Sequence, residues 1–180
     1  MFNANGDRVA FYENSGGKNK INQGNVGEIQ AEFLDDGNYQ KPEYIVVSAS
    51  GTDAICITAI TVTHPMSQDT YSFLPGEMAV ACDIWDKNID YPHEESNAQI
   101  QFQDSKSGQK QEARPHCMWI DGGSKEGDSG DTTEWKGFQV HLPDFKPDGS
   151  TPKAWKDDPY QMCGSRTRFG VYKTLNKYSG

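Results

Sequence analysis

The chain is short of basic charge, because 17 Lys and Arg residues stand against 26 Asp and Glu residues in 180 positions, a formal net charge of -9. Sequence-independent binding to nucleic acid needs a concentrated basic surface that displaces counterions from phosphates. An anionic membrane surface attracts the same kind of basic patch. We therefore expect neither nucleic acid nor an acidic membrane surface as a partner.

Long apolar runs are also missing, and the mean hydropathy is -0.80. A membrane-spanning helix needs about 20 consecutive apolar residues, so we expect no membrane insertion. Aromatic residues nevertheless make up 11% of the chain, which is more than disordered chains usually carry. Because 180 residues can bury one core without help from a metal, the sequence predicts a single domain over residues 1–180.

The sequence contains none of the short motifs that identify common catalytic or metal centres. It has no Gly-x-Ser-x-Gly elbow, no His-Glu-x-x-His pair and no His-x-His pair. Paired-carboxylate chemistry stays open, because its signature is a spatial separation and the chain has 26 acids to choose from.

Four cysteines are dispersed along the chain without a Cys-x-x-Cys pair: Cys56, Cys82, Cys117 and Cys163. This spacing disfavours a zinc or thioredoxin-like motif and favours two disulfides in a secreted, extracellular protein. Of the three possible pairings we favour Cys56 with Cys82 and Cys117 with Cys163, because the first pair lies on consecutive predicted strands and the second would anchor the C-terminal segment. The alternative is four reduced thiols in a cytosolic protein.

Turn residues divide the chain into about ten short segments rich in β-branched and aromatic side chains. The segments predicted to be strands are residues 8–12, 28–34, 43–49, 54–64, 71–74, 77–84, 98–103, 114–120, 138–142 and 168–175. Residues 54–64 are apolar on both faces and are predicted to form a central core strand. The pattern predicts an all-β fold, a two-sheet β-sandwich or jelly roll with long polar loops. Residues 104–113, 121–131 and 143–159 are predicted loops.

Two acidic groups are candidate cation sites. Asp121, Glu126, Asp128 and Asp131 lie in a Gly-rich loop and offer the oxygen ligands that Ca²⁺ prefers, although the spacing matches no EF-hand. The second group surrounds Trp85 and Tyr91 and consists of Asp83, Asp86, Asp90, Glu94 and Glu95. A cation or sugar site competes in both places with a solvated acidic surface. Apart from Ca²⁺, we expect no cofactor.

Among the four histidines, His141 is the best candidate for an accessible functional imidazole, because it follows Gln139 on one strand face and precedes Asp144. His116 shares a predicted strand face with Met118 and Ile120, which favours a hydrogen-bonded interior histidine.

Trp85, Trp135 and Trp155, together with Tyr91, are candidate ligand-binding aromatics, whereas Trp119 is expected in the core. Trp135 and Trp155 lie in or near predicted loops, Trp85 follows a predicted strand, and Trp119 lies within one beside Cys117. Exposed tryptophans can stack against sugars, as aromatic side chains do in many binding sites. Loop aromatics can equally cover a satellite core, so both interpretations of Trp135 and Trp155 stay open.

Residues 54–62, 117–121 and 137–145, together with Cys163 ahead of Arg168 and Phe169, resemble a group of small secreted, cysteine-containing fungal proteins. The resemblance implies a secreted fungal protein with conserved disulfides, of the size common among effectors and small toxins. It implies no particular site residue.

The leading hypothesis is a secreted, non-enzymatic binding protein, effector-, toxin- or lectin-like, that recognises an extracellular glycan or host-surface target. The alternative is a secreted hydrolase acting on polysaccharide, with His141, Asp144 and the acids after Cys82 as candidate residues. A structural or storage protein is the third. Binding requires an exposed aromatic patch, catalysis requires converging titratable groups, and storage requires neither.

Overall fold

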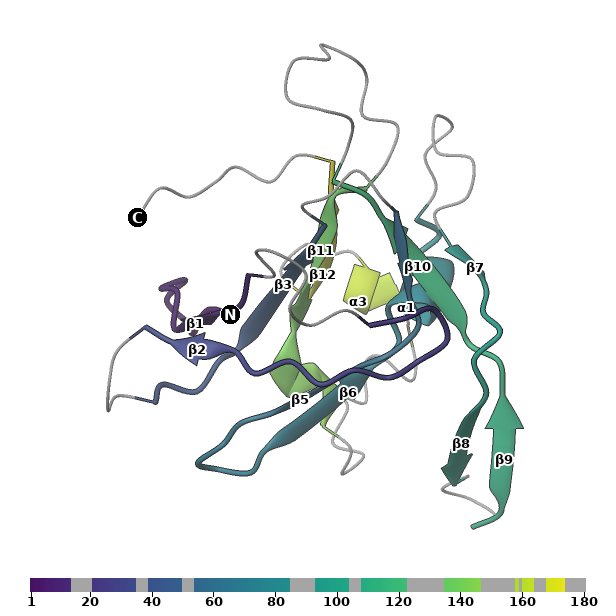
Figure 1. The fold of residues 1–180 in the computed structure, drawn as a ribbon, viewed down its shortest axis with the longest axis horizontal. Coiled ribbons are helices and arrows are strands. Elements are labelled where there is room, and N and C mark those ends of the chain that lie inside the picture. The colour runs from purple at the N-terminus through teal and green to yellow at the C-terminus, as the bar shows by residue number, and fades with distance from the viewer. Residues whose placement is uncertain are drawn as a thin grey trace.

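A computed structural model describes residues 1–13, 21–34, 39–49, 54–84, 93–103, 108–122, 135–146, 158, 160–163 and 168–173. The described chain is mostly β, with antiparallel sheets and a few short helices (Figure 1). The strands are β1 Ala10–Phe11, β2 Glu32–Phe33, β3 Tyr44–Ser48, β4 Ile55–Ile57, β5 Ile60–Thr63, β6 Thr70–Phe73, β7 His93–Glu95, β8 Ile100–Gln103, β9 Lys110–Ala113, β10 His116–Ile120, β11 Gly137–His141 and β12 Phe169–Tyr172. The helices are α1 Pro75–Ala81, the 3-10 turn η1 Leu142–Phe145 and α3 Tyr160–Cys163.

Two three-stranded antiparallel sheets form the centre of the molecule. One has the strand order β12-β11-β3 and the other β4-β10-β7, and three further strand pairs are β1-β2, β5-β6 and β8-β9. The two middle strands, β10 and β11, contribute fully buried side chains to the core, namely Phe138 and Val140 on β11 and Met118 on β10. A mostly β architecture with several antiparallel sheets is therefore confirmed.

One apolar cluster connects both sheets, the β5-β6 hairpin and the helices. It contains Ile45, Val62, Tyr71, Phe73, Met78, Ala79, Met118, Ile120, Phe138, Val140, Leu142, Met162 and Phe169. The rings of Phe73 and Phe138 meet edge to face with centroids 6.5 Å apart, and Phe138 also contacts Phe169 at 6.3 Å. Such aromatic contacts add to the free energy gained from burial.

The strand expected at residues 77–84 is wrong, because this segment belongs to helix α1. Pro75 occupies the first turn, where its missing N–H costs no hydrogen bond. Gly76 lies directly against the backbone of His116 and Cys117, so a β-carbon has no room there. The helix ends in a Schellman motif, with Asp83 at φ 47° and its N–H bonded to the carbonyl of Val80.

Residues 54–64 do not form one central strand, contrary to the prediction. The segment is divided into β4, which pairs with β10, and β5, which pairs with β6 in another sheet. Ile55 is 47% exposed, so β4 is not covered on both sides. The β-branched residues favoured strand, but the apolar run alone did not show where the chain turns.

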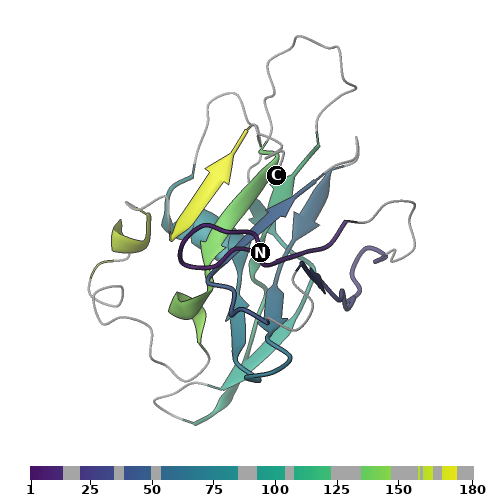
Figure 2. The same ribbon diagram turned by 90° about the vertical axis from the view of Figure 1, so that its left-hand side faces the viewer.

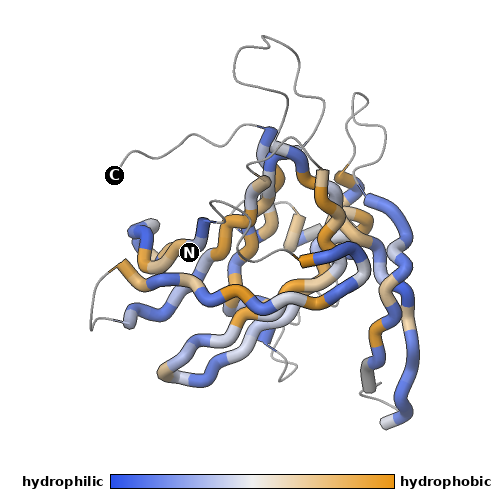
Figure 3. The backbone as a smooth tube through the Cα atoms, in the orientation of Figure 1, coloured by the Kyte–Doolittle hydropathy of each residue, from blue (hydrophilic) through white to orange (hydrophobic). Residues whose placement is uncertain are grey.

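Two other predicted boundaries differ from the structure. Residues 104–113 were expected to be a loop, yet Lys110–Ala113 form β9, which pairs with β8 in a hairpin that projects from the body (Figure 1). The described part of this hairpin is largely hydrophilic (Figure 3), which is why its composition suggested a loop. In the predicted strand 28–34, only Glu32–Phe33 are paired, with β1.

Both disulfides are present, but the favoured pairing is wrong. Cys56 is bonded to Cys117 and Cys82 to Cys163, with Cα atoms 5.3 and 5.1 Å apart. The first bridge joins neighbouring strands β4 and β10, and the second joins the end of α1 to α3. Two disulfides are typical of an oxidising, extracellular compartment. Among the described helices, none has the length and apolar character needed to cross a membrane.

Candidate functional site

The outer face of the β12-β11-β3 sheet, called the sheet face below, brings His141 together with residues distant in sequence. Because Phe138 and Val140 are buried, the alternation of a strand turns Gln139 and His141 away from the core. Tyr44 on β3 is the direct partner of His141 across the ladder and so lies on the same side. Figure 2 shows β12 in yellow beside β11 in green, with β3 next to them.

Asp144 holds the imidazole of His141 in place. The chain leaves β11 through η1, which returns the Asp144 carboxylate to within 2.7 Å of the His141 Nδ1 atom. A carboxylate only accepts hydrogen bonds, so Nδ1 is the donor and Nε2 is the nitrogen directed away from Asp144. Asp144 is 8% exposed, so this hydrogen bond is largely shielded from water. Residues 143–159 were expected to be irregular, but their first residues form this 3-10 turn.

Further charged and aromatic groups surround the imidazole. The Nε2 atom of His141 is 3.7 Å from a Glu43 carboxylate oxygen, so the ring lies between two carboxylates. Arg168 Nε is 3.9 Å from the Asp144 carboxylate and adds a guanidinium to the same place. The ring of Tyr44 is tilted against His141, with centroids 4.9 Å apart.

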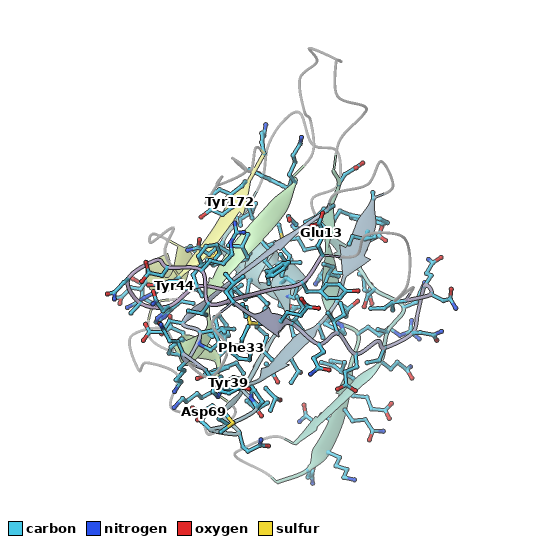
Figure 4. All side chains as sticks on the ribbon, turned by 60° about the vertical axis from the view of Figure 1, so that its left-hand side comes forward. Glu13, Phe33, Tyr39, Tyr44, Asp69 and Tyr172 are labelled. Atoms are coloured by element: carbon cyan, nitrogen blue, oxygen red, sulfur yellow. A yellow bond between two sulfur atoms is a disulfide. The ribbon has the colours of Figure 1, made fainter. Side chains whose placement is uncertain are left out.

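The other end of the sheet face is formed by Tyr172, Gln139 and Gly170. The Tyr172 hydroxyl donates a hydrogen bond of 3.4 Å to the Gln139 side-chain oxygen. Gly170 is the direct partner of Gln139 in the ladder and is buried. Tyr44 and Tyr172 are labelled in Figure 4, on β3 and β12 of this sheet. The sheet face thus offers two phenols, two carboxylates, an amide, an imidazole and a guanidinium.

Of the ligand-binding tryptophans predicted from sequence, Trp135 is described and Trp85 and Trp155 lie outside the described residues, as does Tyr91. Trp135 is half-buried and contacts the apolar core. Its indole N–H is buried without a hydrogen-bond partner among the described residues. Lys173 Nζ lies 5.6 Å from the ring centroid. In this arrangement Trp135 covers the end of the core.

Of the four predicted calcium ligands, the structure describes Asp121, whereas Glu126, Asp128 and Asp131 lie outside the described residues. Asp121 is half-buried, and its backbone N–H donates to the Trp135 carbonyl at 2.9 Å. Within the described ranges, one set of three ligand-type groups is gathered closely enough to hold a metal ion, namely Cys56, Glu94 and Cys117. Both sulfur atoms of that set are bonded to each other.

A turn after β5 contains a serine-histidine contact that the sequence patterns missed. Ser67 Oγ is 3.1 Å from His64 Nδ1 and donates to the Asp69 carboxylate at 3.0 Å. Lys41 lies 2.7 Å from the same carboxylate, and this hydrogen bond is the main cause that raises the pKa of Lys41 and lowers the pKa of Asp69. His64 is 4% exposed and beneath Phe33, whose ring also contacts Tyr39. Phe33, Tyr39 and Asp69 are labelled near one another in Figure 4. The serine therefore caps a turn.

A second histidine-carboxylate pair joins α1 to β10. Glu77 accepts hydrogen bonds from the His116 backbone N–H at 2.7 Å and from its ring Nδ1 at 2.9 Å. His116 is therefore hydrogen-bonded, as expected. Its side chain is 36% exposed, so it lies at the edge of the interior and not within it. The ring of His93 on β7 meets it edge to face at 5.7 Å.

Fold and site together define a disulfide-bridged, mostly β protein with a polar and aromatic sheet face. In comparisons with known proteins, no family model matches the chain, and neither a curated protein nor a solved structure is significantly similar. The arguments about function therefore rest on the residues themselves.

Sequence reasoning found His141 and Asp144 but missed Glu43, Tyr44 and Arg168. Only the spacing of Asp144, three positions after His141, is local. The alternation of residues 43–49 placed Tyr44 on one face of a strand, but nothing in the sequence specified that β3 lies beside β11. Arg168 is close because its carbonyl accepts the His141 N–H at 2.9 Å.

Proposed function

We propose that the sheet face binds an extracellular carbohydrate and that the protein acts by binding without catalysis. The observation that carries the proposal is the convergence of Tyr44, His141 and Arg168 with two carboxylates on one partly exposed side of the sheet. A glycan displayed on a host surface is the expected ligand, which fits an effector-, toxin- or lectin-like role.

The aromatic part of the sheet face suits the apolar side of a sugar ring. Tyr44 is half-buried, and its side chain is braced by the imidazole at 4.9 Å. A braced aromatic ring loses little conformational entropy when a ligand stacks on it. Tyr172, at the other end of the face, offers a second phenol and is held by Gln139.

The polar part suits sugar hydroxyl groups, which both donate and accept hydrogen bonds. Glu43 and Asp144 provide acceptors, and Arg168 provides several donors in a fixed plane. Glu43 is the more accessible of the two acids, since 38% of its side chain is exposed against 10% for Asp144. We therefore assign contact with the ligand to Glu43 and orientation of His141 to Asp144.

The test is a glycan array followed by titration of the best glycan against Tyr44→Ala and Glu43→Gln. Loss of one aromatic stacking partner should weaken binding by about two- to tenfold, since such contacts contribute about 0.5 to 1.5 kcal/mol. Tyr39→Ala is a matched control, because Tyr39 is a 48% exposed tyrosine that contacts Phe33 rather than the sheet face. No binding on the array, or equal binding by Tyr44→Ala and the parent, would contradict the proposal.

A hydrolase acting on polysaccharide is the second candidate, favoured by the 2.7 Å contact between Asp144 and His141. An imidazole oriented by a buried acid is the usual form of a general base. Binding is preferred because the Nε2 atom of His141 faces Glu43, a second anion. If the protein cleaved a polysaccharide panel and His141→Ala abolished turnover, hydrolysis would replace binding as the function.

Two broader statements belong to the same proposal. Secretion is supported by the two disulfides, and the fungal, effector-like origin rests on the sequence resemblance. A two-layer β-sandwich is supported by the single core that β10 and β11 share. A structural or storage protein would need no such face, so a complete lack of ligands on the array favours it.

A further inference from the structure

Two imidazoles lie side by side where β7, β10 and the start of α1 meet. His93 and His116 are diagonal neighbours in the antiparallel ladder, because His93 pairs with Met118 and His116 with Glu95. Their ring centroids are 5.7 Å apart and their planes perpendicular. Two imidazoles that share one tetrahedral ion at a nitrogen-metal distance of about 2.0 to 2.1 Å have centroids roughly 5 to 6 Å apart. The spacing therefore suits joint coordination.

Metal-binding histidines usually donate their second ring N–H to a supporting carboxylate, and Glu77 is such a carboxylate for His116. Its carboxylate accepts from the His116 Nδ1 atom at 2.9 Å and from the His116 backbone at 2.7 Å. The Nδ1 proton is thereby fixed and Nε2 is left as the basic nitrogen. Gly76, next to Glu77, lies against the backbone of His116 and Cys117, so α1 cannot shift away from β10 without losing this contact.

We propose that His93 and His116 form a binding site for a borderline transition-metal cation such as Zn²⁺, with Glu77 as the residue that positions His116. The structure gathers no third ligand around both rings within the described residues, and the proposed site would take its remaining ligands from water. His93 is partly exposed at the start of the edge strand β7, and in the proposed site its side chain turns so that a ring nitrogen faces the ion.

Charges around the pair suit a cation. Burial, followed by the charge of His116, lowers the pKa of His93. Burial raises the pKa of Glu77, but the hydrogen bonds and charge of His116 outweigh this and lower it overall. Asp83 also acts on His93, and Glu94 and Glu95 follow it on the same strand. The anionic surroundings offset the charge of a bound ion.

The ligand type predicts which ions bind. Imidazole nitrogen prefers Cu²⁺, Zn²⁺ and Ni²⁺, whereas Ca²⁺ and Mg²⁺ prefer oxygen. The site is thus distinct from the calcium loop expected at residues 121–131, and it does not depend on the sheet face. Binding should also be lost on acidification, because protons compete for both nitrogens.

The test is isothermal titration of the full, disulfide-bonded chain with ZnCl₂ at pH 7.5 after removal of metals with EDTA. We expect one ion per chain, no binding of CaCl₂, and a higher melting temperature with Zn²⁺. His93→Gln should weaken Zn²⁺ binding at least about tenfold, equivalent to 1.4 kcal/mol. Glu77→Gln should weaken it by about tenfold with unchanged stoichiometry, since supporting residues typically contribute 10- to 100-fold.

His141→Gln is the matched control, because that imidazole is also held by a carboxylate at Nδ1 but has no second imidazole in contact among the described residues. It should bind Zn²⁺ like the parent. His93→Gln keeps the test usable if His116→Gln fails to fold, since His93 lies at the end of an edge strand. The proposal is overturned if the parent shows no Zn²⁺ binding, if His93→Gln binds like the parent, or if His141→Gln loses as much affinity.

Discussion

The two histidine-carboxylate pairs use the same bond in different surroundings. Asp144 holds His141 at 2.7 Å and Glu77 holds His116 at 2.9 Å, in both cases through Nδ1. The first pair is local, with its partners three positions apart in the sequence, whereas the second joins a helix to a strand 39 positions away. Asp144 is nearly buried, and Glu77 is 44% exposed. The shared bond fixes each imidazole but does not decide its use.

The two imidazoles differ in the groups that they contact besides their carboxylate partner. His141 faces a carboxylate and a tyrosine ring on a partly exposed sheet face, a combination suited to a polar ligand with an apolar face. His116 faces a second imidazole, a combination suited to a cation. A residue that looks equivalent in sequence can therefore belong to a binding surface or to a metal site, according to its neighbours.

Removal of a disulfide should have the largest effect on the free energy of unfolding, and each bridge should affect a different region. Each bridge closes a long loop, with sequence separations of 61 and 81, so removal of either pair should cost about 4 kcal/mol of unfolding free energy. Cys82→Ser with Cys163→Ser cuts a link between α1 and α3, which contacts β12. Cys56→Ser with Cys117→Ser cuts a link within one sheet.

Urea denaturation and amide NMR would measure this contrast. Shift changes should reach the sheet face in the Cys82 and Cys163 variant and stay within the β4-β10-β7 sheet in the other. The reverse distribution would contradict the assigned connection between the two regions.

Gly76→Ala should have the next largest effect on the free energy of unfolding. The new β-carbon would collide with the backbone of His116 and Cys117, which cannot yield as a flexible side chain can. We expect a loss of about 3 kcal/mol, the upper part of the range for overpacking, measured by thermal or urea unfolding. Gly6→Ala is a poor control because of its positive φ, so Ser72→Ala at an exposed strand position is preferable. If Gly76→Ala unfolded at the same midpoint as the parent, the close packing of α1 against the β10 backbone would be contradicted.

Removing one charge from each pair compares the two bonds directly. Asp144→Asn should cost about 2 kcal/mol, because a nearly buried acid loses a hydrogen bond to His141 and its interaction with Arg168. Glu77→Gln should cost less than about 1 kcal/mol, because solvent screens a carboxylate that is 44% exposed. Equal losses in urea titrations would mean that burial does not separate the pairs.

The smallest effect should be a pH dependence carried by His93. Burial lowers the pKa of His93 in the folded protein below 6.5, the ordinary value for histidine, so the unfolded chain binds the proton more readily. Stability should therefore fall as the pH drops through about 6.5 and level off below the folded pKa, with a slope under about 1.4 kcal/mol per pH unit. His93→Asn should flatten this slope. A ring titration by NMR with a midpoint above 6.5 would show the opposite sign.

Local sequence chemistry predicted several strands because their side chains suit a pleated, half-buried surface. Residues 43–49 and 114–120 were expected to be strands and contain β3 and β10, and the strand expected at residues 138–142 overlaps all of β11 except Gly137. Residues 77–84 failed, because the apolar content of a short segment does not distinguish helix from strand. The signal that would have distinguished them is Pro75, which is favourable in the first turn of a helix.

The sequence by itself determined the acidic, mostly β character of the chain, the presence of two disulfides and the adjacency of His141 and Asp144, since all of these follow from composition or short spacing. Only the tertiary structure decided the disulfide pairing, because bonding requires two Cα atoms about 5 Å apart and not a sequence interval. It likewise decided that Tyr44 and Arg168 join His141 and that His93 joins His116. These contacts depend on strand order and register, which are set by burial of the whole core rather than by any one segment.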